Sequence, residues 1–212
     1  MSEQPPGGIE LSPDEIVALD ARWSSCWTPR QVADRLAGVE TLWYVAAGWA
    51  LDLFRGEQTR PHGDLEIAVP ARCFPRVRER FSGYVIDAVG SGRIWENATA
   101  DALAATHQTW VRDPASGNYL VDVFREPHDG DSWICRRDET IRLPYGDIIL
   151  HSPDGIPYLA PELVLLFKAK RVRTKDQADF DDTVPRMSPA RRATLVELLD
   201  RVHPGHRWLT AL

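Results

Sequence analysis

Three acidic side chains in two apolar segments are the residues best suited to metal-dependent chemistry. Asp64 and Glu66 alternate with apolar residues in the segment DLEIAV, and alternate residues of a strand project from one face. Two such close carboxylates repel each other and are poorly solvated, and a divalent cation between them relieves both effects. Asp122 lies in a second apolar segment, NYLVDVFRE. If that segment forms a strand beside the first, the three carboxylates become one set of metal ligands.

The elements before the first two carboxylates are short and well delimited. An apolar run over 42–47 is typical of a buried strand, and Gly48 follows it. A helical pattern over 49–54 then stops at Gly56. A polar loop leads from there into the carboxylate segment, so the sequence predicts a strand, a turn, a short helix, a loop and a second strand.

This stretch resembles the signature of the polymerase-beta-type nucleotidyltransferase superfamily, in which a small-residue turn precedes a strand that carries two carboxylates. More narrowly, GWALD and TRPHGDLE are similar to motifs of the aminoglycoside 2''-adenylyltransferase-like branch, which also includes lincosamide nucleotidyltransferases. Two positions depart from the pattern of that branch. Ala47 stands where its turn has a first glycine, and Glu66 stands where aspartate is usual.

The resemblance and the element pattern together imply an α/β (α+β) fold. We expect a nucleotidyltransferase-type mixed sheet flanked by helices, with a C-terminal helical portion. The predicted boundaries are a flexible N-terminal tail over 1–10, a catalytic domain over 11–155 and the helical portion over 156–212.

Capping patterns predict where the helices begin. Ser12 and Thr28 are each followed by proline and then by Glu or Gln, which is a complete N-terminal signal. Thr174 and Ser188 are expected to begin two C-terminal helices, and Pro161 opens the apolar segment PELVLLFKAK. The remaining elements expected are a helix over 74–81 and strands over 84–89, 106–112, 118–125, 140–144 and 156–159.

Nucleotidyl transfer requires a neutralised triphosphate and an acceptor hydroxyl in line with the α-phosphorus, which two metal ions can provide. The resemblance therefore implies that Asp64, Glu66 and Asp122 are catalytic and hold two Mg²⁺ ions, with ATP as the donor. Asp122 is either a metal ligand or the base that takes the hydroxyl proton. The alternative is a solvent-exposed aspartate at a strand end.

The resemblance also suggests residues that contact the nucleotide. Gly48 would let the backbone approach the triphosphate, and the helix N-terminus at Trp49 would offer amide groups. Arg60 would bind phosphate or a carboxylate, or else form a salt bridge that stabilises the loop. His62 would orient Asp64 or contact substrate, and the alternative is a structural histidine.

Two further groups of polar residues bear on the nucleotide site. Asp52 is expected to brace the loop by accepting hydrogen bonds from Arg60 or from backbone amides. In FKAKRVRTKDQADF, Lys168, Arg171 and Lys175 share one face if the helix continues, and this face could reach the β- and γ-phosphates. The alternative is a solvated basic face paired with nearby aspartates, Asp176 and Asp179.

Composition narrows the possible partners and compartment. The chain has 212 residues, 43% of them hydrophobic, so it can bury the core of one domain or of two small ones. A net charge of −6 disfavours a nucleic-acid binder that uses a basic surface, and it suits a cationic acceptor. Three widely spaced cysteines, no signal-like N-terminus and no membrane-length apolar run favour a cytoplasmic protein.

Our first hypothesis is a Mg²⁺-dependent adenylyltransferase that moves AMP from ATP to a hydroxyl of an aminoglycoside-like antibiotic and so confers antibiotic resistance. Acidic and aromatic residues would form the acceptor pocket, namely Glu126, Asp129, Asp131 and Trp133. A second hypothesis is a toxin-type nucleotidyltransferase that modifies a protein or tRNA. A third is a catalytically decayed nucleotide-binding module, for which Ala47 and Glu66 would be early signs.

Overall fold

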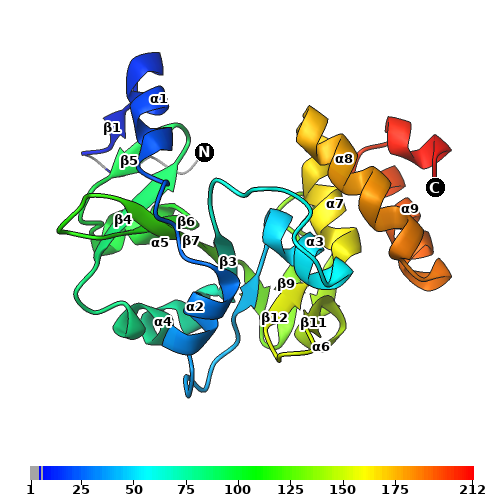
Figure 1. Ribbon diagram of the computed structural model, residues 1–212, viewed down its shortest axis with the longest axis horizontal. Coiled ribbons are helices and arrows are strands. Elements are labelled where there is room, and N and C mark those ends of the chain that lie inside the picture. The colour runs from blue at the N-terminus through cyan, green and yellow to red at the C-terminus, as the bar shows by residue number, and fades with distance from the viewer. Residues whose placement is uncertain (1–4, 6) are drawn as a thin grey trace. The chain divides into compact units, whose positions relative to one another are not determined.

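A computed structural model describes residue 5 and residues 7–212 of the protein (Figure 1). Contacts divide the chain into two compact units. Unit 1 comprises Met1–Trp43 and His62–Pro127, and unit 2 comprises Tyr44–Pro61 and His128–Leu212. The domain boundaries expected from the sequence remain a prediction. Within the expected flexible tail, residues 1–4 and 6 lie outside the described residues.

The sheet of unit 1 contains both antiparallel and parallel pairs. Its strands lie in the order β1 (Ile9–Glu10), β5 (Arg93–Trp95), β4 (Val85–Gly90), β6 (Gln108–Arg112), β7 (Tyr119–Glu126) and β3 (Glu66–Pro70). The pairs are antiparallel except for β3 and β7, which run parallel. Strand β1 includes the last two residues of the expected tail, so these residues are ordered by pairing with β5. The apolar residues of β3 and β7, except the half-buried Phe124, are buried and form much of the core.

Two of the helices of unit 1 begin where the capping patterns predicted. The helices of this unit are α1 (Pro13–Ala21), α2 (Pro29–Arg35), α4 (Phe74–Arg80) and α5 (Ala100–Ala105), and the 3-10 turn η1 (Ala71–Cys73) precedes α4. Ser12 caps α1 and Thr28 caps α2, each within a complete capping box. Segment 92–104, to which the sequence assigned no element, contains β5 and most of α5.

Unit 2 combines short strands with the C-terminal helices. Strand β12 (Pro157–Leu159) runs parallel to β2 (Tyr44–Val45) and antiparallel to β11 (Ile149–His151). A second sheet has the order β10 (Arg142–Pro144), β9 (Ser132–Ile134) and β8 (His128–Asp129). The helices are α3 (Ala47–Arg55), α6 (Tyr145–Ile148), α7 (Pro161–Lys168), α8 (Thr174–Thr183) and α9 (Pro189–Val202), with 3-10 turns η2 (Ala169–Arg171), η3 (Val184–Arg186) and η4 (Arg207–Thr210).

The core of unit 2 is built around α7. Leu163, Leu165 and Leu166 are at most 1% exposed, and α7 packs against α9, whose Leu195 and Leu199 are fully buried. Burial of apolar side chains at this density is the main source of helix stability. The predicted mixed sheets flanked by helices, followed by a helical C-terminal portion, are therefore confirmed.

Several predicted boundaries shift in the structure. The capping box expected at Thr174 is wrong by one residue, because the N-cap of α8 is Arg173. The backbone N–H of Arg173 donates to Asp176 Oδ2 at 3.1 Å. The strand expected from residue 64 begins at Glu66, so Asp64 precedes it. The apolar run over 42–47 was expected to form a strand, but only its residues Tyr44–Val45 do so, as β2. The strand is short because Ala46 is already the N-cap of α3.

Candidate active site

The parallel pairing of β3 and β7 brings two of the predicted carboxylates together. Glu66 is the direct partner of Asp122 in the register, and Ile67 is the partner of Val123. Directly paired residues of neighbouring strands project from the same face of a sheet. Both carboxylates therefore lie side by side on one face of unit 1.

Asp64 lies just before β3 and is exposed to solvent. The backbone N–H of Asp122 donates to Leu65 O at 2.8 Å, so the residue that follows Asp64 is fixed against β7. After burial, which is the largest cause, the charges of Glu66 and Asp64 both raise the pKa of Asp122. The three predicted carboxylates are therefore electrostatically coupled within unit 1.

Asp122 is the most enclosed of the three carboxylates. Its exposed fraction is 3%, which excludes a solvent-exposed aspartate at a strand end. Gln108 Nε2 donates to Asp122 Oδ2 at 2.5 Å, whereas Asp122 Oδ1 is buried and has no hydrogen-bond partner among the described residues. Burial, and next the charge of Glu66, raises the pKa of Asp122 well above its ordinary value, whereas the Gln108 hydrogen bond and the neighbouring Trp110 indole act in the opposite direction.

Two residues beside Asp122 were missed by the sequence analysis. Gln108 and Trp110 lie on β6, where Trp110 is the direct partner of Asp122. Trp110 packs edge-on against Tyr119 with ring centroids 4.8 Å apart, and Trp23 lies 5.4 Å from Trp110. The sequence placed 106–112 in a strand, but only the β6–β7 register shows that these side chains flank the carboxylate.

The carboxylates fit a divalent cation in their chemistry. Among residues 5 and 7–212, no group of three or more His, Cys, Asp or Glu side chains is gathered closely enough to qualify by itself as a metal site. A buried carboxylate oxygen without a partner, here Asp122 Oδ1, is nevertheless strongly unfavourable until a cation or donor reaches it. Hard oxygen ligands of this kind suit Mg²⁺.

The first residue of α3 has a strained backbone. Ala47 has φ +50°, in the left-handed region that favours glycine. The family signature places its first glycine here, and the structure gives the physical reason. Gly48 follows in the first turn of α3 and is buried, and Trp49 is half-buried. The helix expected over 49–54 is therefore longer at both ends, and it stops at Gly56 as predicted.

Asp52 braces the loop after α3, as the sequence analysis expected. It is 2% exposed and accepts from Thr59 N at 3.3 Å and from Thr59 Oγ1 at 3.0 Å. Arg55 forms an ion pair with Asp52 and donates to Thr183 Oγ1 at 3.1 Å. Asp52 thus ties the loop to α3, and Arg55 extends the network to α8.

Two predicted nucleotide contacts share one carboxylate in unit 2. Arg60 binds both oxygens of Asp179, at 3.2 and 3.0 Å, and Lys168 Nζ lies 2.9 Å from Asp179 and 2.8 Å from Asp176. Although burial acts to raise the pKa of Asp179, Arg60 and Lys168 hold it below its ordinary value. The predicted alternatives, a carboxylate partner for Arg60 and an aspartate-paired Lys168, are both observed.

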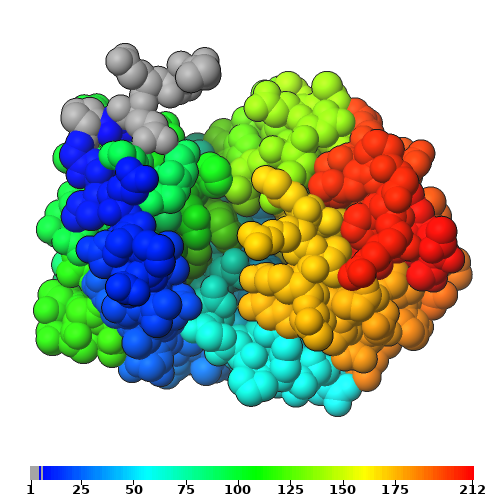
Figure 2. Space-filling model, turned by 90° about the horizontal axis from the view of Figure 1, so that it is seen from above, coloured from blue at the N-terminus to red at the C-terminus, as the bar shows by residue number. Residues whose placement is uncertain are grey.

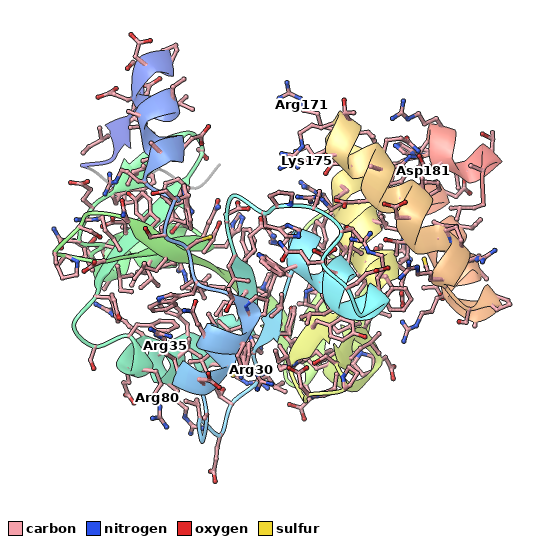
Figure 3. The ribbon with its side chains drawn as sticks, viewed as in Figure 1. Arg30, Arg35, Arg80, Arg171, Lys175 and Asp181 are labelled. Carbon is pink, nitrogen blue, oxygen red and sulfur yellow. The ribbon has the colours of Figure 1, made fainter. Side chains whose placement is uncertain are left out.

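The continuous basic face predicted in this segment is wrong. Helix α7 ends at Lys168, and the turn η2 separates it from α8, so Lys168, Arg171 and Lys175 do not share a helical face. The lysine side chain at 168 is only 9% exposed, whereas Arg171 and Lys175 are exposed beside the start of α8 (Figure 3). The segment after α7 lies on the surface seen in Figure 2.

The remaining predicted site residues are distributed as follows. His62 is half-buried in unit 1. Trp133 was expected in an acceptor pocket, but it is 1% exposed and its ring packs 6.1 Å from Phe167, so it is a core residue. Asp129 is exposed and paired with Arg142 at 2.7 Å. The structure therefore gathers the carboxylates within unit 1 and the basic groups Arg60 and Lys168 within unit 2, with Gly48, Trp49 and Lys175 also in unit 2.

Sequence comparison gives a family for this arrangement. The model of the aminoglycoside-2''-adenylyltransferase family matches residues 29–102, a region that contains the turn and the first two carboxylates. Residues 29–102 are therefore similar in sequence to that family. The predicted resemblance is therefore confirmed, and so is the expectation of a nucleotidyltransferase enzyme. A search of curated proteins found no match.

Comparison with solved structures found similar folds. The crystal structure of the lincomycin-bound lincosamide antibiotic adenylyltransferase LnuA has a TM-score of 0.52 and 16% identity, and the similarity covers 84% of this chain and 100% of that one. The solution structure of the antibiotic-resistance factor ANT(2'')-Ia has a TM-score of 0.48 and 14% identity over 87% of this chain and 90% of that one. The similarity to LnuA shows that the two chains share a fold. Among the described helices, none is long and apolar enough to span a membrane.

Proposed function

We propose that this protein transfers AMP from ATP to a hydroxyl group of a small, cationic antibiotic. The observation that carries the proposal is the pair Glu66 and Asp122, which are direct partners on parallel strands and leave a buried carboxylate oxygen without a partner. Such a pair is unfavourable for folding alone and is explained by a cation-dependent reaction. The family signature around Asp64 and Glu66 supports the same chemistry.

Asp64, Glu66 and Asp122 are the proposed ligands of two Mg²⁺ ions. When bound, Mg²⁺ would neutralise the triphosphate and stabilise the charge that develops on the attacking and leaving oxygens. Gln108 holds Asp122 Oδ2, so Oδ1 is the oxygen left to bind a metal or accept the hydroxyl proton. A fixed carboxylate orientation of this kind favours transfer because no reorganisation is needed during the reaction.

The proposed nucleotide contacts are the backbone at Gly48 and Trp49 and the side chains of Arg60, His62, Lys168 and Lys175. Arg60 and Lys168 already share Asp179, which holds their cationic groups in fixed positions. Preorganised cations bind phosphate with less loss of side-chain entropy than mobile ones. We propose a supporting role for Asp52, through the loop that contains Arg60.

The acceptor class follows from the family and from charge. The matching family is described by its action on aminoglycosides, and LnuA was solved with lincomycin. Both are hydroxyl-bearing antibiotics, and the net charge of −6 favours a cationic acceptor. We propose that the protein acts in the cytoplasm and contributes to antibiotic resistance.

Mass spectrometry tests this proposal directly. The protein is incubated with ATP, Mg²⁺ and a panel of aminoglycosides and lincosamides, and the drugs are analysed for the addition of one AMP. We expect at least one modified drug, with the modification lost when EDTA removes Mg²⁺. Unmodified drugs together with AMP-labelled protein or RNA in a lysate would overturn the small-molecule acceptor and favour a toxin-type enzyme.

A further inference from the structure

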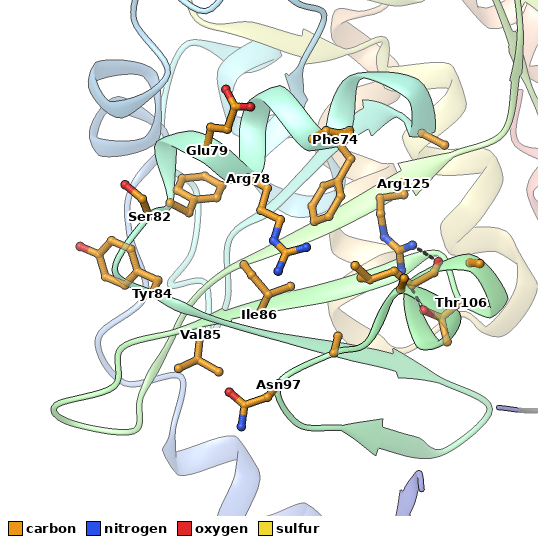
Figure 4. A pocket seen from close by; sticks show the side chains of 17 residues that line it. Phe74, Arg78, Glu79, Ser82, Tyr84, Val85, Ile86, Asn97, Thr106 and Arg125 are labelled. Atoms are coloured by element: carbon orange, nitrogen blue, oxygen red, sulfur yellow. Dashed lines mark hydrogen bonds between the residues drawn. The ribbon is translucent and has the colours of Figure 1, made fainter. Parts of the chain in front are cut away.

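Unit 1 contains a cavity that the proposed transfer reaction does not use. Its volume is about 960 Å³, within the range of sites for small organic ligands, and it is lined by η1, α4, the start of β4, the segment 97–106 and one residue of β7 (Figure 4). All of its lining residues belong to unit 1. The cavity is therefore a property of one compact unit.

The cavity lies on the sheet face opposite the carboxylates. Arg125 lines it and follows Asp122 by three positions on β7, and side chains separated by an odd number of strand residues point to opposite faces. Ile86, which also lines the cavity, gives independent evidence for this face. It pairs with Val111 on β6, and Val111 pairs with Val121 on β7. Val121 is four residues from Arg125, so their side chains lie on the same face of the sheet. A ligand in this cavity would not occupy the proposed metal site.

Arg125 is a buried cation, and none of the described acidic side chains is its partner. It is 8% exposed and donates to Thr109 Oγ1 and Thr106 Oγ1 at 2.8 Å, to Gln108 O at 3.4 Å, and to Leu103 O. All four acceptors are neutral, and burial lowers the pKa of Arg125 to about 10. A guanidinium has five N–H donors, so these contacts hold the group in place but leave one donor and the full positive charge for an anion.

A second guanidinium points into the same space. Arg78 on α4 lines the cavity, and no hydrogen bond or ion pair of its side chain is found among the described residues. Figure 4 shows its guanidinium group directed into the cavity between Phe74 and Ile86. The surrounding wall is mainly apolar and aromatic, with Tyr84 and Leu103 also lining it. The acidic residue of the wall, Glu79, is exposed.

We propose that this cavity binds a small organic carboxylate with a planar apolar body, such as an arylcarboxylate. The carboxylate would bind Arg78 and Arg125, and the ring would lie against Phe74 and Ile86. One negative charge matches the single remaining N–H of Arg125, and Glu79 disfavours a dianion such as a phosphate monoester. The proposal does not depend on the transfer reaction.

Isothermal titration calorimetry with 1-naphthoate tests the proposal on the full chain. We expect saturable binding at one site per chain, and binding at least tenfold weaker for the neutral analogue 1-naphthalenemethanol. Arg78→Gln should weaken naphthoate binding about tenfold, because it removes a charged partner from an exposed position that the fold does not need. Arg80→Gln is the matched control, because Arg80 is also on α4 but does not line the cavity (Figure 3).

A second variant tests the cavity by its volume. Ala104→Trp places a large ring on an exposed lining position of α5 and should abolish naphthoate binding without removing any charge. Equal affinity for naphthoate and its alcohol would overturn the proposal, as would equal naphthoate affinity in Arg78→Gln and the parent protein. The absence of saturable naphthoate binding at about 1 mM, or tighter binding of inorganic phosphate, would also overturn it.

Discussion

Glu66 and Asp122 are direct partners on the parallel strands β3 and β7, and their carboxylates share one face of the sheet. Asp122 is buried, and this burial, followed by the charge of Glu66, raises its pKa. Without a bound cation, this pair opposes folding, because two like charges lie together where water solvates them poorly. The arrangement is therefore best understood as a functional feature that lowers the stability of the metal-free protein.

The first prediction concerns that loss of stability. Asp122→Asn removes one of the two charges and keeps the shape of the side chain, so it should raise the free energy of unfolding by about 1–3 kcal/mol in EDTA. The same variant should lose AMP transfer. Urea unfolding followed by tryptophan fluorescence measures the first effect, and a lower stability of the variant in EDTA would contradict it.

The second prediction concerns Gln108, which donates to Asp122 Oδ2. Gln108→Leu removes this hydrogen bond and frees the carboxylate to rotate, so kcat should fall about 10- to 100-fold. The KM for the acceptor should change little, because Gln108 acts through Asp122. Steady-state kinetics separates the two constants, and an unchanged kcat in a variant with normal thermal unfolding would exclude the positioning role.

The third prediction follows from the backbone of Ala47. Its φ of +50° is unfavourable for a residue with a Cβ, so Ala47→Gly should stabilise the protein by about 1 kcal/mol. Ala50→Gly is the matched control, because Ala50 lies inside the same helix and should instead destabilise by about 1 kcal/mol. Thermal unfolding compares the two variants, and a lower Tm for Ala47→Gly would show that the turn is not strained.

The fourth prediction concerns pH and Asp179, the shared partner of Arg60 and Lys168. Its pKa is lower in the folded protein than its ordinary value of 3.8, so its contribution to stability is present above that pH and is lost as the pH falls through the lower folded value. Asp179→Asn should therefore reduce the free energy of unfolding at pH 7 by about 3 kcal/mol. The difference from the parent protein should shrink in strong acid.

Asp181→Asn provides the control for this effect. Asp181 is on the same helix and is exposed, and its carboxylate accepts from Gln177 at 2.8 Å (Figure 3). Urea unfolding at pH 7 and in acid should show a pH-dependent loss for Asp179→Asn and little change for Asp181→Asn. Equal effects of both substitutions would mean that the Asp179 network contributes nothing specific.

The sequence was sufficient for features that depend on local patterns. The caps at Ser12 and Thr28, the stop at Gly56 and the carboxylate positions all follow from neighbouring residues, and the structure contains them. The pairing of Asp122 with Glu66 was expected from the two apolar segments that carry them, and the β3–β7 register provides it.

The remaining features depend on contacts between distant parts of the chain. Gln108 could not be assigned to Asp122 because the β6–β7 register places it there. The prediction of a basic face through Lys168 was wrong because the helical spacing of the basic residues continues in the sequence where the backbone leaves the helix at η2. Asp176 and Asp179, which follow this turn, bind Lys168. The sequence marked Ala47 only as a departure from a family glycine, because alanine by itself gives no signal for a left-handed backbone.

The central claim is that Asp64, Glu66 and Asp122 act together as the metal-binding carboxylates of AMP transfer. The most direct test is the rate of Mg²⁺-dependent AMP transfer, measured by mass spectrometry on a drug that the parent protein modifies. Asp64→Asn, Glu66→Gln and Asp122→Asn should each lower this rate by about 1,000-fold or more, whereas Asp200→Asn, at an exposed position of α9, should leave it unchanged. Parent-level transfer by any of the three carboxylate variants would contradict the account.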